Sequence, residues 1–207
     1  MSLAKKKITA PPVSKPAREI DEHIVEILSD SGEGAQKCGQ SFGAISARLG
    51  YGIWTVEIIP AEIQPPARSV DGASGNRIRV ASRRITNGGD QADLAVAFNE
   101  QVLLGRLRAD ELKSGSTILL EDKWRNDADP AVAESYVEVY ETLLKRGFDV
   151  HEIPMEAECL KIVSDPRKGK NMFVLGLLCS IYSLDLEAGH EQIQFIFGKK
   201  GELVVTS

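Results

Sequence analysis

The sequence predicts a single α/β domain of Rossmann-like type, in which a mostly parallel sheet is flanked by helices. From residue 23 onward, short runs of aliphatic and β-branched residues alternate with helical patterns, as they do in chains built from βαβ units. Residues 92–98 (ADLAVAF) are almost continuously apolar, which is typical of a central parallel strand buried on both faces. The length of 207 residues suits one domain with its own core.

The first half of the chain predicts a strand, a turn and a helix, followed by two more strands. Residues 23–29 (HIVEILS) form the first strand, and the apolar residues of the next helix recur at steps of three and four. That helix also carries a row of small residues that favours close packing of its backbone. Residues 52–59 predict the second strand. Residues 61–75 are irregular over a length that indicates a functional or mobile loop. Basic and apolar residues alternate over residues 76–85, which predicts a half-exposed strand.

The second half continues the alternation of strands and helices after residues 92–98. The expected elements are a helix at residues 100–107, a turn at 113–115, a strand at 116–120, a helix from Asp129 to Gly147, a strand at 148–153, and helices at 171–183 and 186–197. Asp129 and Pro130 are favoured residues for the N-cap and first position of a helix. The helix at 171–183 is apolar nearly all round, so we expect it to be buried.

Composition and charge exclude several classes of protein. The net charge of −5 and the isoelectric point near 5.4 argue against general nucleic-acid binding. The basic, proline-containing residues 1–19 predict a disordered arm. No apolar signal segment follows them, and the longest apolar run, residues 172–181, is shorter than the about 20 residues that span a bilayer. We therefore expect a cytoplasmic protein with no membrane contact.

Metal and catalytic motifs are absent from the sequence. Three cysteines, Cys38, Cys159 and Cys179, lie far apart and form no C-x-x-C pair, so no metal site is predicted. Neither a phosphate-binding Walker A loop nor the G-D-G segment of thiamine diphosphate sites occurs. The histidines are isolated from any nucleophile. No catalytic residue is predicted.

Candidate binding residues lie where strands end, because ligands of open parallel sheets bind beyond the carboxyl ends of the strands. These ends carry residues 30–34, 60–62, 99 and 121–122, which we expect to converge. The Gly32-Glu33-Gly34 turn precedes a helix N-terminus, which suits an anion, although the spacing G-x-G-x-x-G is missing and a purely structural turn is the alternative. Arg77 and Arg79 offer guanidinium groups for phosphate or carboxylate, or else form a solvated strand face.

Several segments together resemble one known family. These segments are "GYGIWTVEIIPAEI", "SGNRIRVASRRI", "GDQADLAVAFNE", "LKSGSTILLED", "KNMFVLGLL" and "FGKKGELVV". In this order, over residues 24–206, they resemble the gamma domain of 2-oxoacid:ferredoxin oxidoreductases, which would occupy residues 20–207 here. "PAEI" and "GDQADLAVAFNE" are most similar to the type in which this domain is fused to others and acts on 2-oxoglutarate.

The resemblance implies a non-catalytic unit, inactive alone, of a complex that oxidatively decarboxylates a 2-oxoacid to an acyl-CoA. Electrons would pass to ferredoxin, and thiamine diphosphate and iron–sulfur clusters would sit on partner subunits or domains. This unit would support assembly and contact coenzyme A. The strand ends and the resemblance together predict these cofactor-binding residues: Gly32, Glu33, Gly34, Glu62, Arg77, Arg79 and Asn99.

The chain departs from the family pattern at two places. Ser29 and Ser31 occupy glycine positions of the family turn, and residues 64–66 (QPP) replace a common R-G-G. Proline has no N–H to donate, so this loop loses backbone contacts that the family makes. Two other functions therefore stay open: a free-standing regulatory module that binds coenzyme A or a nucleotide, and a small independent enzyme. The sequence does not select among the 2-oxoacids.

Overall fold

The structure, a computed structural model, describes residues 18–166, 169–185 and 187. Its strands are β1 (Glu22–Asp30), β2 (Gly52–Ile58), β3 (Ala73–Ala81), β4 (Ala92–Ala97), β5 (Leu112–Glu121) and β6 (Asp149–Ile153). Its helices are α1 (Ala35–Arg48), α2 (Gln101–Arg108), the 3₁₀ helix η1 (Lys123–Asn126), α3 (Pro130–Lys145), α4 (Met155–Leu160) and α5 (Lys170–Ile181).

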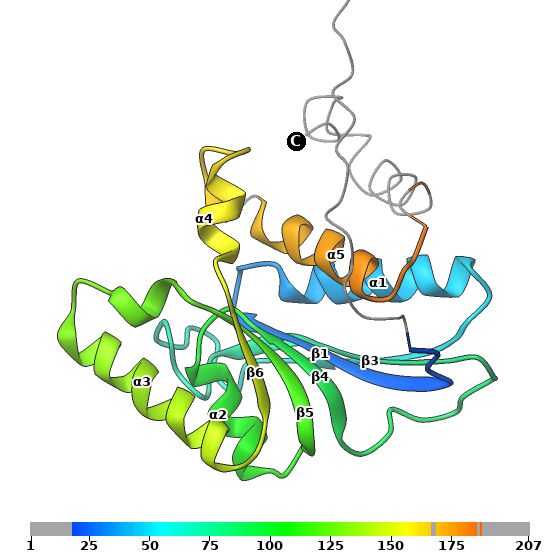
Figure 1. The fold of residues 1–207 in the computed structure, drawn as a ribbon, viewed down its shortest axis with the longest axis horizontal. Coiled ribbons are helices and arrows are strands. Elements are labelled where there is room, and N and C mark those ends of the chain that lie inside the picture. Colours follow the sequence, from blue (N-terminus) through cyan, green and yellow to red (C-terminus); the bar gives the residue numbers. More distant parts are fainter. Residues whose placement is uncertain (1–17, 167–168, 186, 188–207) are drawn as a thin grey trace, which may run out of the picture.

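The six strands form one sheet in the order β2-β3-β1-β4-β5-β6, with helices on both faces (Figure 1). The pairs β1–β4, β4–β5 and β5–β6 are parallel, whereas β3 runs antiparallel to both β1 and β2. The predicted single α/β domain with a mostly parallel, helix-flanked sheet is therefore confirmed.

Alternation along β1 builds a core on each face of the sheet. Val25 and Ile27 belong to the core under α1 and α5, and Ile24 and Leu28 belong to the core over α2 and α3. Successive side chains of a strand point to opposite faces, so an apolar run buries both. Figure 1 shows α1 and α5 on one side of the sheet and α2 and α3 on the other.

Helix α1 packs closely on β2 and β3 through its small residues, as the sequence predicts. A Cβ at Gly39 would lie only 2.4 Å from the Cβ of Asn76, and one at Gly43 would lie 3.3 Å from Cγ2 of Thr55. The first distance is too short for any side chain. Glycine is thus required at position 39 by the approach of the helix to the sheet.

Several predicted boundaries are wrong. The third strand begins at Ala73 and ends at Ala81, because its residues pair with the full length of β1. The predicted turn at 113–115 lies inside β5, where a register shift against β4 and the positive φ of Gly115 (74°) absorb the irregularity. Helix α4 was not predicted.

The predictions for the second half of the chain differ in outcome. The Asp129 side chain accepts a hydrogen bond from the Ala131 N–H at 3.0 Å, which confirms the predicted helix start. The prediction of a buried helix at 171–183 is wrong in part, because α5 is buried on one side only and Ile181 is 45% exposed. The predicted helix at 186–197 and most of the predicted arm lie outside the described residues. No helix within the described ranges is long and apolar enough to cross a membrane.

Candidate functional site

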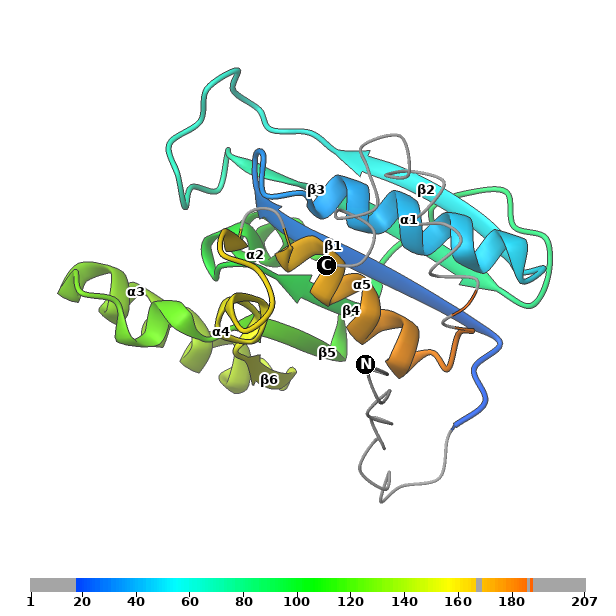
Figure 2. The same ribbon diagram turned by 90° about the horizontal axis from the view of Figure 1, so that it is seen from above.

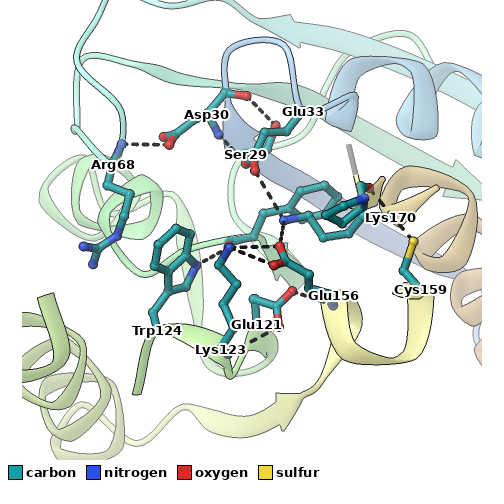
Figure 3. A network of polar contacts seen from close by, with 12 residues as sticks. Ser29, Asp30, Glu33, Arg68, Glu121, Lys123, Trp124, Glu156, Cys159 and Lys170 are labelled. Atoms are coloured by element: carbon teal, nitrogen blue, oxygen red, sulfur yellow. Dashed lines mark hydrogen bonds and ion pairs between the residues drawn. The ribbon is translucent and has the colours of Figure 1, made fainter. Parts of the chain in front are cut away.

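Polar residues converge at the carboxyl edge of the sheet, where β1, β4 and β5 end side by side. Asp30 ends β1, Asn99 and Glu100 follow β4, and Glu121 ends β5. Figure 3 shows Asp30 and Glu121 at this edge together with Glu33 and Arg68 from loops, Lys123 and Trp124 from η1, Glu156 from α4 and Lys170 from α5. Of the residues expected to converge (30–34, 60–62, 99 and 121–122), the ends of β1, β4 and β5 do so, whereas Glu62 lies exposed in the loop after β2. We define the carboxyl-edge cluster as Asp30, Glu33, Arg68, Asn99, Glu100, Glu121, Lys123, Trp124, Glu156 and Lys170.

The turn between β1 and α1 depends on its glycines and on Glu33. Gly32 (φ 88°) and Gly34 (φ 93°) are left-handed, a conformation that favours glycine. The Glu33 carboxylate folds back and accepts hydrogen bonds from the Asp30 N–H and the Lys170 ammonium, both at 3.3 Å. The N-cap of α1 is Gly34, and no side chain caps this helix. The N-terminus of α1 keeps its affinity for an anion.

Lys170, the first residue of α5, is the buried cation of this cluster. Its side chain is 2% exposed and forms ion pairs with Glu33 at 3.3 Å and Glu156 at 3.7 Å. Its ammonium nitrogen also lies 4.9 Å from the centre of the Phe98 ring, where the ring face attracts a cation. Lys170 thus connects α5 with the turn after β1, with α4 and with the end of β4.

Glu121 is fully buried and accepts two backbone hydrogen bonds. The Glu156 N–H donates to Oε2 at 2.9 Å, and the Lys123 N–H donates to Oε1 at 3.4 Å. Burial raises the pKa of the Glu121 carboxyl to about 7, although Lys170 and the two N–H groups oppose the rise. This carboxyl therefore changes charge near neutral pH.

Replacement of Glu121 by glutamine is expected to alter how stability depends on pH. Between pH 4.5, the ordinary glutamate pKa, and about pH 7, the Glu121 carboxyl keeps its proton in the folded protein but loses it in the unfolded chain. The contribution of Glu121 to stability therefore falls as the pH rises through this range. Glu121→Gln cannot ionise. Relative to wild type, we expect it to gain about 2 kcal/mol in the free energy of unfolding between pH 5 and pH 8. Urea unfolding at both values measures this gain.

The exposed residue Glu141 supplies the matched control. Its carboxylate pairs with Lys145 on the surface of α3, where its side chain is 56% exposed. Glu141→Gln should show no such dependence on pH. Equal behaviour of the two variants would contradict the raised pKa of Glu121.

Arg68 holds the β2–β3 loop (residues 59–72) against the carboxyl-edge cluster. Its N–H donates to Asp30 Oδ2 at 2.7 Å, and its guanidinium pairs with Glu100, which is fully buried. The guanidinium carbon also lies 4.6 Å from the centre of the Trp124 ring, and the Trp124 indole N–H donates to the Phe98 carbonyl at 2.8 Å. Arg68 takes a left-handed φ of 52° in making these contacts.

Four polar atoms of Arg68 and of nearby residues are buried and have no hydrogen-bond partner among the described residues. They are Asp30 Oδ1, Arg68 Nε, Asn99 Nδ2 and Glu100 Oε2. A buried polar atom without a partner costs about 1–3 kcal/mol, so these four atoms are candidates for contact with a ligand or with water. Two of the atoms are donors and two are acceptors.

Of the residues predicted from the sequence, only some meet at this edge. Gly32, Glu33 and Gly34 form the turn, and Asn99 lies beside Glu100, where its Oδ1 accepts hydrogen bonds from the first N–H groups of α2. Glu62 lies exposed in the β2–β3 loop.

Arg77 and Arg79 lie apart from the carboxyl-edge cluster. Because β3 is antiparallel to β1, Arg79 sits opposite Ile24, near the amino end of β1. Arg77 pairs with Glu26 and Arg79 with Glu22, and their side chains are only 11% and 14% exposed. The alternative expectation, a solvated strand face, is therefore wrong: these guanidinium groups are paired within the sheet face.

Lys170, Glu156 and Glu100 were not predicted from the sequence as parts of this site. Lys170 begins an apolar helix, and a charged residue next to an apolar run is a signal that could have been used. Within the described residues, no group of three or more histidine, cysteine or acidic side chains could hold a metal ion. Cys38, Cys159 and Cys179 are free and buried.

Comparison with known proteins identifies the family. Residues 25–206 match the family described as pyruvate ferredoxin/flavodoxin oxidoreductase. The chain belongs to this family. It is 29% identical over 195 residues to the 2-oxoglutarate oxidoreductase subunit KorA of Mycobacterium tuberculosis, a match that covers 90% of the chain and 29% of KorA.

Solved structures of the family share the fold. The 2-oxoglutarate:ferredoxin oxidoreductase of Magnetococcus marinus, solved with 2-oxoglutarate, coenzyme A and succinyl-CoA bound, superposes with a TM-score of 0.69 at 26% identity, over 91% of this chain and 29% of that one. The gamma subunit of a keto/oxoacid ferredoxin oxidoreductase from Geobacter sulfurreducens gives 0.62 at 13% identity, over 89% of each chain. The pyruvate oxidoreductase subunit PORC of Thermotoga maritima gives 0.56 at 16% identity, over 90% of this chain and 89% of that one. The chain thus spans under a third of the length of KorA and of the Magnetococcus marinus enzyme. It spans most of the length of the Geobacter sulfurreducens and Thermotoga maritima subunits.

Proposed function

We propose that this chain is the gamma unit of a 2-oxoglutarate:ferredoxin oxidoreductase, and that its carboxyl-edge cluster contacts coenzyme A. The KorA subunit and the Magnetococcus marinus enzyme, at 29% and 26% identity, are each named for 2-oxoglutarate. The observation that carries the proposal is the group of four buried, unpartnered polar atoms at the carboxyl edge. Thiamine diphosphate and iron–sulfur clusters would belong to other subunits or domains of the complex.

The chemistry of the cluster fits the amide-containing pantetheine arm of coenzyme A better than its phosphates. An amide offers one N–H and one carbonyl, which match the acceptors Asp30 Oδ1 and Glu100 Oε2 and the donors Arg68 Nε and Asn99 Nδ2. Three cations face five carboxylates here: Arg68, Lys123 and Lys170 against Asp30, Glu33, Glu100, Glu121 and Glu156. An added phosphate would be repelled by this excess of negative charge.

The phosphates of coenzyme A would fit at the rim of the cluster. The N-terminus of α1 has no capping side chain there, and the Lys123 side chain is 33% exposed. Bound coenzyme A would supply the thiol that accepts the acyl group. This chain's own residues would bind and orient the arm, and the paired charges of Glu33 and Lys170 would keep the turn in place.

Access to the four buried atoms requires movement of the β2–β3 loop, which Arg68 holds in place. Arg68 contacts Asp30, Glu100 and Trp124 together, so its release would uncover the carboxylates of Asp30 and Glu100. We infer that coenzyme A takes over these contacts when the loop moves. Positions 64–66, where glutamine and two prolines stand, would stiffen this loop.

Replacement of Asn99 by aspartate tests the contact with coenzyme A. Asn99→Asp keeps the oxygen that caps α2, replaces the unpartnered Nδ2 donor by an acceptor oxygen, and adds a carboxylate charge to the cluster. In the complex purified from its source through a tagged chain, with ferredoxin as acceptor, we expect the KM for coenzyme A to rise about tenfold. That factor corresponds to roughly 1.4 kcal/mol, within the range for one lost hydrogen bond to a buried group. The KM for 2-oxoglutarate should be unchanged.

Asn87→Asp makes the same substitution at an exposed turn on the other side of the fold and should leave both constants unchanged. An unchanged KM for coenzyme A in Asn99→Asp would contradict the contact while leaving the assignment to the complex intact. Purification of the chain without partners and without coenzyme A-dependent oxidation would contradict the assignment itself. It would favour the free-standing binding module instead.

A further inference from the structure

Trp124, in η1, holds a fixed aromatic ring at the carboxyl-edge cluster. Its indole N–H donates to the Phe98 carbonyl at 2.8 Å, which sets the orientation of the ring, and the residue packs against the core formed with α2 and α3. It is nevertheless only partly buried. Two cations lie against the ring, since the Arg68 guanidinium carbon is 4.6 Å and the Lys123 ammonium nitrogen 4.1 Å from its centre. The ring is therefore held in place while it contacts charged groups.

Only one of these two cations would stay at the ring when the site opens. Arg68 belongs to the β2–β3 loop, which Figure 2 shows at the same end of the sheet as α3 and α4. Lys123 directly precedes Trp124 in η1. When the loop moves as inferred above, Arg68 leaves the ring, whereas the hydrogen bond to Phe98 and the contact with Lys123 remain. The movement that admits a ligand to the cluster therefore also uncovers the Trp124 ring where Arg68 had been.

An aromatic ring next to a cation is suited to a nucleotide, because the base stacks on the ring while the cation attracts a phosphate. Lys123 is 33% exposed, although it also pairs with Glu156 at 2.9 Å. Within coenzyme A, the diphosphate joins the pantetheine arm to adenosine. With the arm in the carboxyl-edge cluster and the phosphates at Lys123, the next group along the molecule is the adenosine. Its adenine is the one aromatic ring system of coenzyme A, and the Trp124 ring adjoins Lys123 at this point.

We propose that the adenine of coenzyme A stacks on Trp124 in place of the Arg68 guanidinium. The inference rests on the proposed function, because it starts from a pantetheine arm that lies in the carboxyl-edge cluster. A guanidinium and a purine are both flat and both stack on aromatic rings, so the same position suits either. If the branched methyl groups of the pantetheine arm packed on the ring instead, loss of the ring would weaken every acyl acceptor that carries this arm.

Two acyl acceptors test this assignment in the complex purified through a tagged chain. 4′-Phosphopantetheine carries the same thiol arm as coenzyme A but lacks adenosine. In Trp124→Leu we expect kcat/KM for coenzyme A to fall about tenfold, a loss typical of one base stacked on an aromatic side chain. The value for 4′-phosphopantetheine should fall by at most about twofold, because this acceptor has no base to stack. Adenosine 3′,5′-bisphosphate, the nucleotide half of coenzyme A, should compete with coenzyme A, and its Ki should be about tenfold higher in Trp124→Leu.

Three further variants separate stacking from support of the fold. Trp124→Phe keeps an aromatic ring without the indole N–H, and we expect it to restore kcat/KM for coenzyme A to within about threefold of wild type. Trp54→Leu changes the other tryptophan, which is 42% exposed on β2, and should affect neither acceptor. Asn99→Asp should weaken both acceptors alike, because both carry the arm.

The outcomes distinguish this inference from the proposed function. Equal losses with both acceptors in Trp124→Leu, or no loss with coenzyme A, would overturn the adenine site. The proposed function would still stand if Asn99→Asp weakened both acceptors. A wild-type complex without coenzyme A-dependent oxidation would overturn both.

Discussion

Replacement of Lys170 by methionine is expected to lower the free energy of unfolding by about 3–5 kcal/mol at pH 8, the usual effect of removing one partner from a buried ion pair. Methionine preserves the apolar stem and removes the charge. Glu33 and Glu156 would then lose the ammonium 3.3 and 3.7 Å away. Urea unfolding measures the loss, and it is large against the 5–15 kcal/mol typical of whole domains.

A spectroscopic readout separates this electrostatic role from packing. Lys170 lowers the pKa of Glu121, which burial raises to about 7. Removal of the ammonium should therefore move the titration midpoint of the Glu121 carboxyl, followed by ¹³C NMR, further upward. A loss of packing alone would leave that midpoint in place.

The matched control is Lys161→Met. Lys161 pairs with Glu158, but its side chain is 66% exposed. Exposed pairs contribute about 0–1 kcal/mol, so little change is expected. If Lys170→Met were as mild as Lys161→Met, the buried cation would not organise the carboxyl edge.

Local patterns predicted most of the fold because the physical causes of its elements are local. The apolar run ending at Phe98, the capping residue Asp129 and the glycines of the first turn each act within a few residues. The reversal of β3 could not be predicted in this way. The direction of β3 depends on the strand with which it pairs. That pairing is made with residues more than 50 positions away in the sequence, such as Glu26, which pairs with Arg77.

The carboxyl-edge cluster was predicted only in part for the same reason. The ends of parallel strands must meet, so Asp30, Asn99 and Glu121 could be expected together. Lys170 and Arg68 reach the cluster from α5 and from a loop, and nothing in their own segments indicates where those segments dock. Arg77 and Arg79 were grouped with the site by residue type, whereas strand direction places them away from it.

Replacement of Arg77 by methionine is expected to destabilise the fold by about 3 kcal/mol at neutral pH. The Glu26 carboxylate is fully buried and pairs with Arg77 Nε at 2.8 Å and with Arg106 Nε at 3.2 Å. Burial already raises the pKa of Glu26, and the two arginines oppose that rise. Without Arg77 the pKa should rise further, so the deficit in stability should grow as the pH is raised and shrink as it is lowered.

Two further variants show whether the unpaired charge causes this loss. Arg83→Met removes an arginine that is 66% exposed and pairs with Glu22 at 2.6 Å, and we expect a change of at most about 1 kcal/mol. Adding Glu26→Gln to Arg77→Met removes the buried charge itself and should restore part of the lost stability at neutral pH. A double variant as unstable as Arg77→Met at every pH would mean that the arginine stem, by packing on the sheet, is what stabilises this face.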